Sequence, residues 1–444
     1  MHHDADLRLD SFHLEERKKA LAEVFEKAQA SSGLLPPFTD HFNLHCHSFY
    51  SFNGYGFSPS HLAWQGRKLG LRAMAMVDFD VLDGADEFLE ASRFLGMKAG
   101  VGMETRVFVP EFAQYEINSP GEPGVAYHIG LGFTSSRVKD PGLLSSFKDK
   151  AQARTRAVVN KVNTLLQEIA LDYEKDVLSL TPAGNATERH VCAAYYLKSL
   201  DVFPDAADLH DWWARKLDLS VEETAASIAS PPVFQAILRS KTMKQGGVGY
   251  IPCQGEDFPV LKEVNRFILD NGAIPVLAFL DGTSSGEERM EDLLEVMMDS
   301  GVSAVNIIPD RNWNIKDPQT RALKVRKLAE FIQQARDHHL PIIVGTEMNA
   351  HGQVLVDGFD SAELRPYFQD FEAGMYFLHG HSVLQALAGL GHSSEWASTS
   401  FKSREESNRF YSTVGEMADP AAAKGNVVLS VNDTPGDILR KFSP

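Results

Sequence analysis

The sequence is poor in cysteine, in long apolar runs and in positive charge. Its three cysteines (Cys46, Cys192 and Cys253) are an odd number at wide spacing, which excludes a disulfide framework and fits a reducing compartment. No apolar run approaches the ~20 residues of a membrane helix, and the opening residues are polar and acidic, unlike a secretory signal. Acidic residues outnumber basic ones, 60 to 43, so a long nucleic acid is an unlikely partner. We therefore expect a soluble, cytoplasmic protein with no membrane partner.

Three common catalytic patterns are missing as well. The chain has no G-x-S-x-G segment, no P-loop and no Rossmann glycine fingerprint placed after a strand. These absences disfavour a serine hydrolase, a nucleoside triphosphatase and a dehydrogenase.

Short apolar runs alternate with helical stretches along much of the chain. This alternation predicts an α/β fold, either a parallel sheet or a barrel, with crossover helices. Several runs end in a histidine or a carboxylate, and the carboxyl ends of barrel strands meet at one mouth. The predicted strands span residues 41–47, 72–78, 99–109, 126–133, 273–281, 304–310 and 341–347.

The strand pattern stops in the middle of the chain and again near its end. Both stretches are instead amphipathic and helical in pattern. We therefore divide the chain into five parts: an N-terminal helix (1–38), a first barrel part (39–140), a helical insertion that caps the site (141–250), a second barrel part (251–360) and a C-terminal helical extension (361–444).

Polar side chains on the predicted strands form a candidate metal site. Residues two apart on a strand face the same side, so His45 and His47 can present both imidazoles to one ion. Glu104 and Glu347 add carboxylates and His128 adds a third imidazole, a mixture that suits zinc, manganese or iron(II). Such an ion polarises a phosphoryl oxygen and lowers the pKa of bound water toward neutrality. The sequence therefore predicts metal-assisted hydrolysis.

Six motifs carry these residues in a fixed order: LHCHSFYSFNG, AMVDFDVLDGADEF, GVGMET, YHIGLGF, IPVLAFL and VGTEMNAHG. Together they resemble the motifs of the PHP (polymerase and histidinol phosphatase) superfamily of metal-dependent phosphoesterases. ATERHVCAAYYLKSL in the insertion is similar to a helix of its nucleotide phosphatase and exonuclease branch. The resemblance covers roughly residues 40–360. It implies a distorted (β/α)7-type barrel.

The resemblance also implies a ligand set. His45, His47, Glu104 and Glu347 match the first metal position, and His128 with Glu104 supports a second one. His128 is accordingly a candidate catalytic residue as well as a ligand.

Three positions depart from the superfamily pattern. Phe79, Phe279 and Asn349 stand where the resemblance implies histidine ligands, and phenylalanine cannot bind a metal. We therefore expect a reduced site with one or two divalent ions per chain. Asp78, beside the first of these positions, is a candidate ligand or general base, or else an ordinary turn aspartate.

Phosphate recognition requires cations near this site. The resemblance places Arg189 and His190 of the insertion over the mouth, and Arg311 follows a predicted strand. The planar guanidinium of arginine suits phosphate, although these side chains are also compatible with a solvated surface. We predict a hydrolase acting on a small phosphorylated molecule. The alternatives are a non-catalytic protein that keeps the fold to bind or regulate, and a mononuclear hydrolase of another bond.

Overall fold

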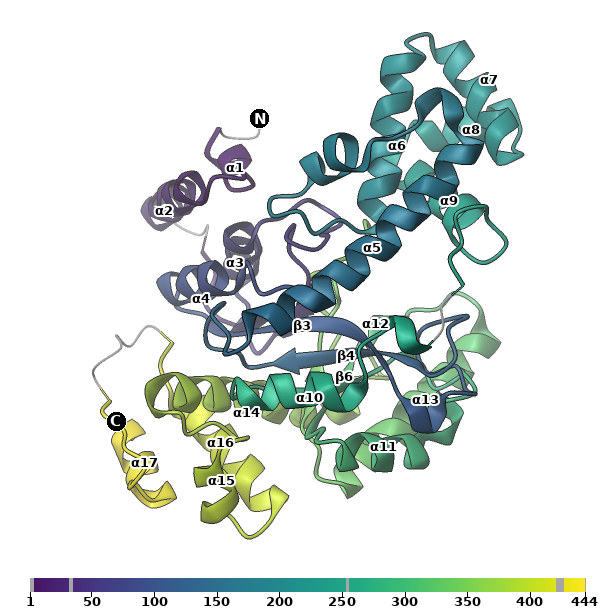
Figure 1. The fold of residues 1–444 in the computed structure, drawn as a ribbon. Coiled ribbons are helices and arrows are strands. Elements are labelled where there is room, and N and C mark those ends of the chain that lie inside the picture. Colours follow the sequence, from purple (N-terminus) through teal and green to yellow (C-terminus); the bar gives the residue numbers. More distant parts are fainter. Residues whose placement is uncertain (1–3, 32–34, 253–254, 421–426, 444) are drawn as a thin grey trace.

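The computed structural model describes residues 4–31, 35–252, 255–420 and 427–443, so Cys253 lies outside the described residues. Seven strands form a single sheet in chain order, surrounded by helices (Figure 1). Their apolar residues are nearly all buried, as expected for a sheet covered on its outer face. The strands are β1 (Phe42–Cys46), β2 (Ala73–Phe79), β3 (Lys98–Phe108), β4 (Val125–Leu131), β5 (Ile274–Phe279), β6 (Ala304–Ile307) and β7 (Ile342–Val344).

The sheet closes on itself at its two edges. Cys46 bridges to Glu347 just beyond β7. The backbone N–H of His47 donates to the carbonyl of Glu347 at 2.7 Å, and the N–H of Glu347 donates to the carbonyl of His45 at 2.8 Å. All neighbouring strands are parallel except β4, which runs antiparallel to both β3 and β5. The predicted mixed α/β barrel is therefore confirmed, with one reversed strand.

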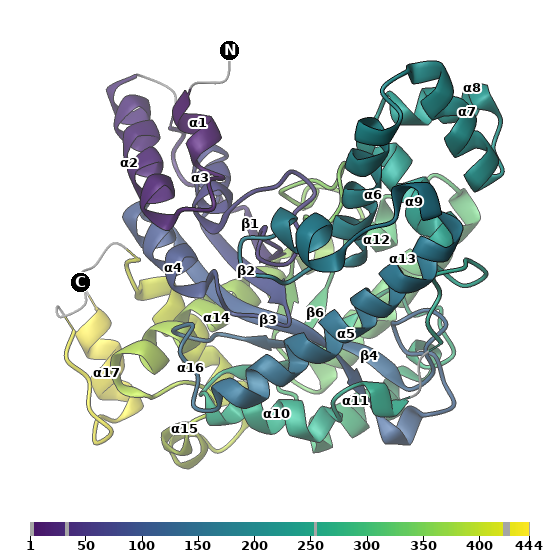
Figure 2. The same cartoon turned by 45° about the horizontal axis from the view of Figure 1, so that its top comes forward.

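Helices cover the outside of the barrel and extend from both ends of the chain (Figure 2). Of the described helices, none is long and apolar enough to cross a membrane. The outer helices are α3 (Pro59–Lys68), α4 (Ala85–Phe94), α10 (Leu261–Asp270), α11 (Met290–Asp299), α12 (Asp310–Trp313) and α13 (Pro318–Asp337), with α1 (Asp4–Arg8) and α2 (Leu14–Ala30) before them and α14 (Phe368–Ala388), α15 (Glu395–Ser400), α16 (Arg404–Met417) and α17 (Pro435–Phe442) after them.

Five helices between β4 and β5 form a separate lobe. Their apolar faces meet in a second hydrophobic core around Tyr195, Trp213 and Phe234, distinct from the core of the barrel. Figure 2 shows this lobe rising on the side of the barrel opposite the N-terminal helices. The helices are α5 (Pro141–Leu165), α6 (Glu188–Val202), α7 (Ala206–Leu217), α8 (Val221–Ile228) and α9 (Pro231–Met243).

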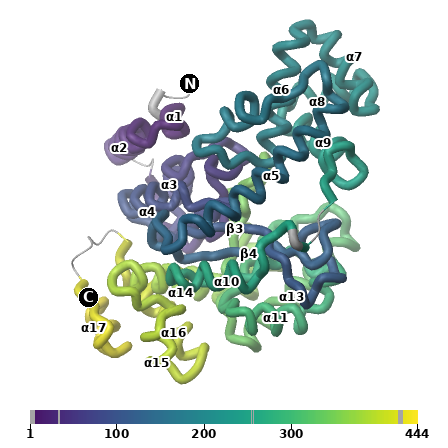
Figure 3. Tube along the Cα trace, viewed as in Figure 1, coloured from purple at the N-terminus to yellow at the C-terminus, as the bar shows by residue number. Residues whose placement is uncertain are grey.

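The C-terminal helices belong to the core of the barrel. Phe371, Leu378 and Tyr411 are fully buried in the same cluster as the strands. Helices α14 and α16 cross at Gly380 and Gly415. A Cβ on Gly380 would lie 1.9 Å from the carbonyl oxygen of Tyr411, so the two helices can approach this closely only with glycine there. In Figure 3 these helices lie together at the end of the molecule away from the lobe.

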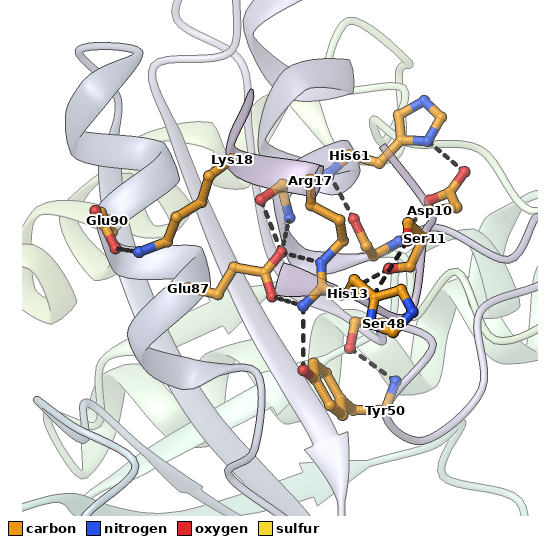
Figure 4. A network of polar contacts seen from close by, with 12 residues as sticks. Asp10, Ser11, His13, Arg17, Lys18, Ser48, Tyr50, His61, Glu87 and Glu90 are labelled. Carbon is orange, nitrogen blue, oxygen red and sulfur yellow. Dashed lines mark hydrogen bonds and ion pairs between the residues drawn. The ribbon is translucent and has the colours of Figure 1, made fainter. Parts of the chain in front are cut away.

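A buried ion pair attaches the N-terminal helix to the barrel (Figure 4). The Arg17 side chain on α2 is fully buried and donates from Nε and Nη2 to both oxygens of Glu87 on α4, at 2.8 and 2.5 Å. Its Nη2 also donates to the hydroxyl of Tyr50 at 3.2 Å. Ser60 donates to the same carboxylate from its backbone N–H and hydroxyl. Helix α2 is thereby linked to the loop that follows β1.

We expect Arg17→Met to lower the free energy of unfolding by about 3–5 kcal/mol, because it leaves the Glu87 carboxylate buried without its cation. Lys18→Met removes the neighbouring exposed pair with Glu90 and is the matched control, with an expected loss below about 1 kcal/mol. Urea denaturation of both variants measures the difference. Equal losses would contradict a dominant role for the buried pair.

Candidate metal centre

Three side chains converge inside the barrel mouth. His45 lies on β1, His47 directly follows it, and Glu104 lies on β3. The Nε2 atoms of the two histidines are 3.3 Å apart. Oε2 of Glu104 lies 3.7 Å from Nε2 of His45 and 3.4 Å from Nε2 of His47. All three side chains are buried. We call them the three-ligand cluster.

The spacing of these donor atoms fits one divalent ion. Zinc bonds of about 2.1 Å at a tetrahedral angle place neighbouring donor atoms about 3.4 Å apart. Burial raises the pKa of Glu104, but the hydrogen bonds and charges of His45 and His47 outweigh it and lower that pKa to about 2. Glu104 is therefore an ionised ligand between two imidazoles. Two histidines and one carboxylate are a known donor set for catalytic zinc, which keeps a fourth position open.

Hydrogen bonds on the far side of each ring orient both imidazoles. Nδ1 of His45 faces Oδ1 of Asn306 on β6 at 3.0 Å. Nδ1 of His47 faces the hydroxyl of Ser51 at 3.3 Å, and this hydroxyl donates to Asp78 at 2.6 Å. Each Nδ1 therefore carries a proton, and each Nε2 faces Glu104; on binding an ion at the common point, Nε2 would give up any proton it holds and offer its lone pair.

Asp78 supports the cluster from behind, which corrects its prediction as ligand or general base. Its two carboxylate oxygens accept hydrogen bonds from the backbone N–H and hydroxyl of Ser48 and from the hydroxyl of Ser51. The side chain is buried and does not line the cavity described below. Neither Ser51 nor Asn306 was predicted; the only signal for Asn306 is an amide inside an apolar strand.

Glu347 does not join the three other ligands predicted for the first metal position. Its carboxylate pairs with the guanidinium of Arg311 and accepts from Nδ2 of Asn349 at 2.9 Å. It lies outside the group of side chains whose ligand atoms are all within 4.8 Å of one another. The predicted four-ligand position is thus a three-ligand cluster in this structure. Arg311, predicted to bind substrate, is held in the same ion pair.

His128 faces away from the barrel interior, which corrects its prediction as a ligand and catalytic residue. In the β3–β4 pairing, Glu104 is opposite Ile129 and Arg106 is opposite Tyr127, so these residues share the inner face. His128 alternates with them and points outward to Asn265 on α10. Burial lowers its pKa to about 4.

A cavity of about 1110 Å³ lies between the barrel mouth and the helical lobe. His45 and Glu104 line it from the barrel and Arg189 lines it from α6. Among the described residues, the Arg189 guanidinium has no hydrogen-bond or ion-pair partner; its Cζ lies 5.7 Å from the centre of the Phe52 ring. Arg189 is thus positioned to meet an anion in the cavity.

His190 has a structural place, contrary to its prediction as a substrate contact. Its Nδ1 accepts from the backbone N–H of Thr187 at 3.1 Å and completes the capping box at the start of α6. The ring is buried and is absent from the cavity wall.

Aromatic side chains occupy two of the positions where the resemblance implies ligands. Phe79 stacks on His47, with ring centres 4.2 Å apart and planes at 23°. Phe279 stacks on Phe331 at 3.9 Å and is only 3% exposed. Asp80, which follows Phe79, also lines the cavity, and burial raises its pKa to about 6.

Comparisons with known proteins agree with the motif resemblance. Residues 43–217 match the family model of the PHP domain, less than half of the chain. The predicted resemblance to the PHP superfamily is therefore confirmed, and the chain carries a PHP domain over this stretch. The matched range contains all three members of the three-ligand cluster.

An error-prone DNA polymerase of Cutibacterium acnes is 36% identical over 75 residues, which are 17% of this chain and 7% of the polymerase. The match thus spans a small fraction of that relative's length.

Two solved structures are similar to this chain. One is an amidohydrolase from Chromobacterium violaceum, with bound sulfate and no metal, which has a TM-score of 0.49 at 16% identity. The matched region covers 75% of this chain and 96% of the amidohydrolase. A protein from Bifidobacterium adolescentis described as a metal-dependent phosphoesterase has a TM-score of 0.45 at 19% identity and covers 76% and 98%.

We expect the purified chain to bind one equivalent of Zn²⁺ or Mn²⁺, and the pair of changes His45→Ala and His47→Ala to abolish this binding, because only one of the three donors remains. His351→Ala removes an exposed loop histidine and is the control. Isothermal titration calorimetry measures both. Unchanged binding in the double variant would place the ion elsewhere.

Asp78→Asn is expected to weaken metal affinity by about 10- to 100-fold while leaving all three donors in place, because the amide cannot accept all the hydrogen bonds that orient His47 through Ser51. The exposed Asp83→Asn is the matched control. Metal competition with a chromophoric chelator measures the change, and an affinity equal to that of the control would contradict the positioning role.

Proposed function

We propose that this protein is a metal-dependent phosphoesterase that hydrolyses a small phosphorylated molecule in the cytoplasm. The supporting observation is the three-ligand cluster: its donor atoms have the spacing that one divalent ion requires, and it opens into a cavity that also contains an unpaired arginine. Catalytic zinc sites commonly use three protein ligands, so the set is sufficient for catalysis without Glu347.

A divalent ion bound here would supply Lewis acidity and a water of lowered pKa. The chain itself binds and orients the substrate. Arg189 can direct parallel N–H donors at two phosphoryl oxygens, because no acid holds it in the described structure. Lys150 lines the same cavity and adds a second positive charge. Arg311 is a weaker choice, because binding phosphate would require it to leave Glu347.

The rival function is a non-catalytic ligand-binding or regulatory protein. The stacking of Phe79 on His47 favours it, because an aromatic ring fills space that a second ion and its ligands would need. A phosphoryl-transfer site with one ion also lacks the two-sided clamp of a binuclear centre. The two functions differ in turnover and not in ligand binding.

In the presence of Mn²⁺ or Zn²⁺ we expect release of phosphate from phosphomonoesters, or release of a phosphomonoester from phosphodiesters, which added alkaline phosphatase then converts to phosphate; chelation of the metal should abolish the turnover. The double variant of His45 and His47 should lower kcat/KM at least 100-fold, because it removes both imidazole donors. Arg189→Gln should mainly raise KM, by about tenfold or more, because it removes the charge that meets the phosphoryl group.

Malachite green detection of phosphate measures turnover, and the exposed His351→Ala again serves as control. Tight binding of a phosphonate analogue without any turnover would favour the ligand-binding alternative. A protein that hydrolyses amides or lactones but no phosphoester would indicate the mononuclear hydrolase of another bond.

A further inference from the structure

We propose that Phe52, Phe79 and Tyr127 form an aromatic patch that binds a planar ring of the substrate beside its phosphoryl group. The inference rests on the proposed function and names the substrate class: phosphoesters whose alcohol carries an aromatic or heteroaromatic ring close to the ester oxygen. All three rings line the cavity and come from different parts of the barrel.

Phe79 is the centre of this patch. One face of its ring is covered by His47 at 4.2 Å, and Tyr127 lies 6.5 Å away at an angle of 51°. The ring is only half-buried and lines the cavity, so its remaining surface faces the open space. A planar group stacked there would sit directly beside the three-ligand cluster.

Phe52 joins the patch to the cation that we assign to the phosphoryl group. Cζ of Arg189 lies 5.7 Å from the centre of the Phe52 ring, and His190 meets the same ring edge-on at 5.0 Å. An aromatic surface and an unpaired guanidinium are therefore adjacent in one cavity. This juxtaposition suits a ligand that is both planar and anionic.

A residue of the helical lobe holds the backbone at the end of β2, which carries Phe79, and in the loop after β1, which carries Phe52. Asn185, which precedes α6 and is buried, donates from Nδ2 to the backbone carbonyl of Phe79 at 2.7 Å and to that of Tyr50 at 3.2 Å. Tyr50 lies two residues before Phe52 in the loop after β1. The backbone at Phe79 and near Phe52 is thus held before a ligand arrives, which reduces the entropy lost on binding.

Phe279 also lines the cavity, but its ring lies almost entirely in the core. It is 3% exposed and stacks in parallel on Phe331 in the core, at 3.9 Å and 7°. Phe52 and Phe79 are both half-buried instead, with surface left on the cavity. Packing in the core therefore does not account for these two rings.

Two phosphonates of equal charge test the patch directly. Benzylphosphonate and cyclohexylmethylphosphonate have rings of similar size, but only the first is planar. We expect the full-length protein to bind benzylphosphonate at least about tenfold more tightly in isothermal titration calorimetry, as stacking on aromatic side chains predicts. Benzyl phosphate should show a similar advantage in kcat/KM over cyclohexylmethyl phosphate.

Phe52→Leu and Phe79→Leu should each reduce the preference for the planar ring at least threefold, because leucine keeps the apolar volume and loses the flat surface. Phe38→Leu, an exposed ring outside the cavity, is the matched control and should keep the preference. Zinc titration of each variant shows whether the three-ligand cluster still binds metal. In the described structure the ring contacts of Phe52 are with His190 and Arg189, neither of which belongs to that cluster.

The outcomes separate this inference from the proposed function. Equal affinity of the wild type for both phosphonates, or an unchanged preference in both leucine variants, would overturn the aromatic patch even if both esters are hydrolysed. A preference for the planar phosphonate without turnover of any ester would support the patch and overturn the phosphoesterase.

Discussion

Two backbone hydrogen bonds between the first strand of the barrel and the residue after the last strand determine where the candidate site lies. The amide of His47 donates to Glu347 and the amide of Glu347 donates to His45, so residues 300 positions apart in the chain become neighbours. Closure at this point brings β1 and β3 around one interior, and their inward side chains form the three-ligand cluster. Without closure, Asn306 and Arg311 from the β6 side of the sheet would not lie beside the three-ligand cluster.

The electrostatic requirement of the cluster is a positive charge. Glu104 is buried and ionised, and Asp78 lies behind His47 with Ser51 between them. A buried carboxylate is costly unless a cation or several donors compensate it. The imidazoles supply part of this compensation when Nε2 as well as Nδ1 is protonated, but a histidine in that state cannot bind a metal. A divalent ion at the shared point satisfies Glu104 while both histidines remain neutral, which is the state in which they are ligands.

Much of this architecture could be predicted from residue patterns, and the failures have physical causes. All seven predicted strands exist, because buried strands are short apolar runs between helices. The prediction for His128 failed because β4 is paired antiparallel with β3, and the register that puts Tyr127 and Ile129 inside necessarily puts His128 outside. The prediction for Glu347 failed because β7 ends at Val344: Glu347 and Met348 have positive φ values of 64° and 57°, so the alternation of a strand no longer applies. Asp78 was placed correctly beside the mouth, but a sequence does not show that three serine donors already occupy its oxygens.

The charges in the cavity argue for one ion rather than several. Two neutral imidazoles and one carboxylate give a divalent site a net charge of about +1, and Arg189 adds another, which together balance a phosphate dianion. A second divalent ion would need further carboxylates near the first. In the described structure three of the acids that line the cavity are held by cations: Glu122 by Arg106 and Arg154, Glu188 by Arg239 and Lys244, and Glu347 by Arg311. Phe79 and Phe279 stand where the resemblance implies histidine ligands, so fewer ligands are left for a second metal ion. Their rings also make the space beside the single site more apolar. Under the proposed function, a catalyst built this way would recognise its substrate by the cations Arg189 and Lys150 and one flat surface instead of a cluster of ions.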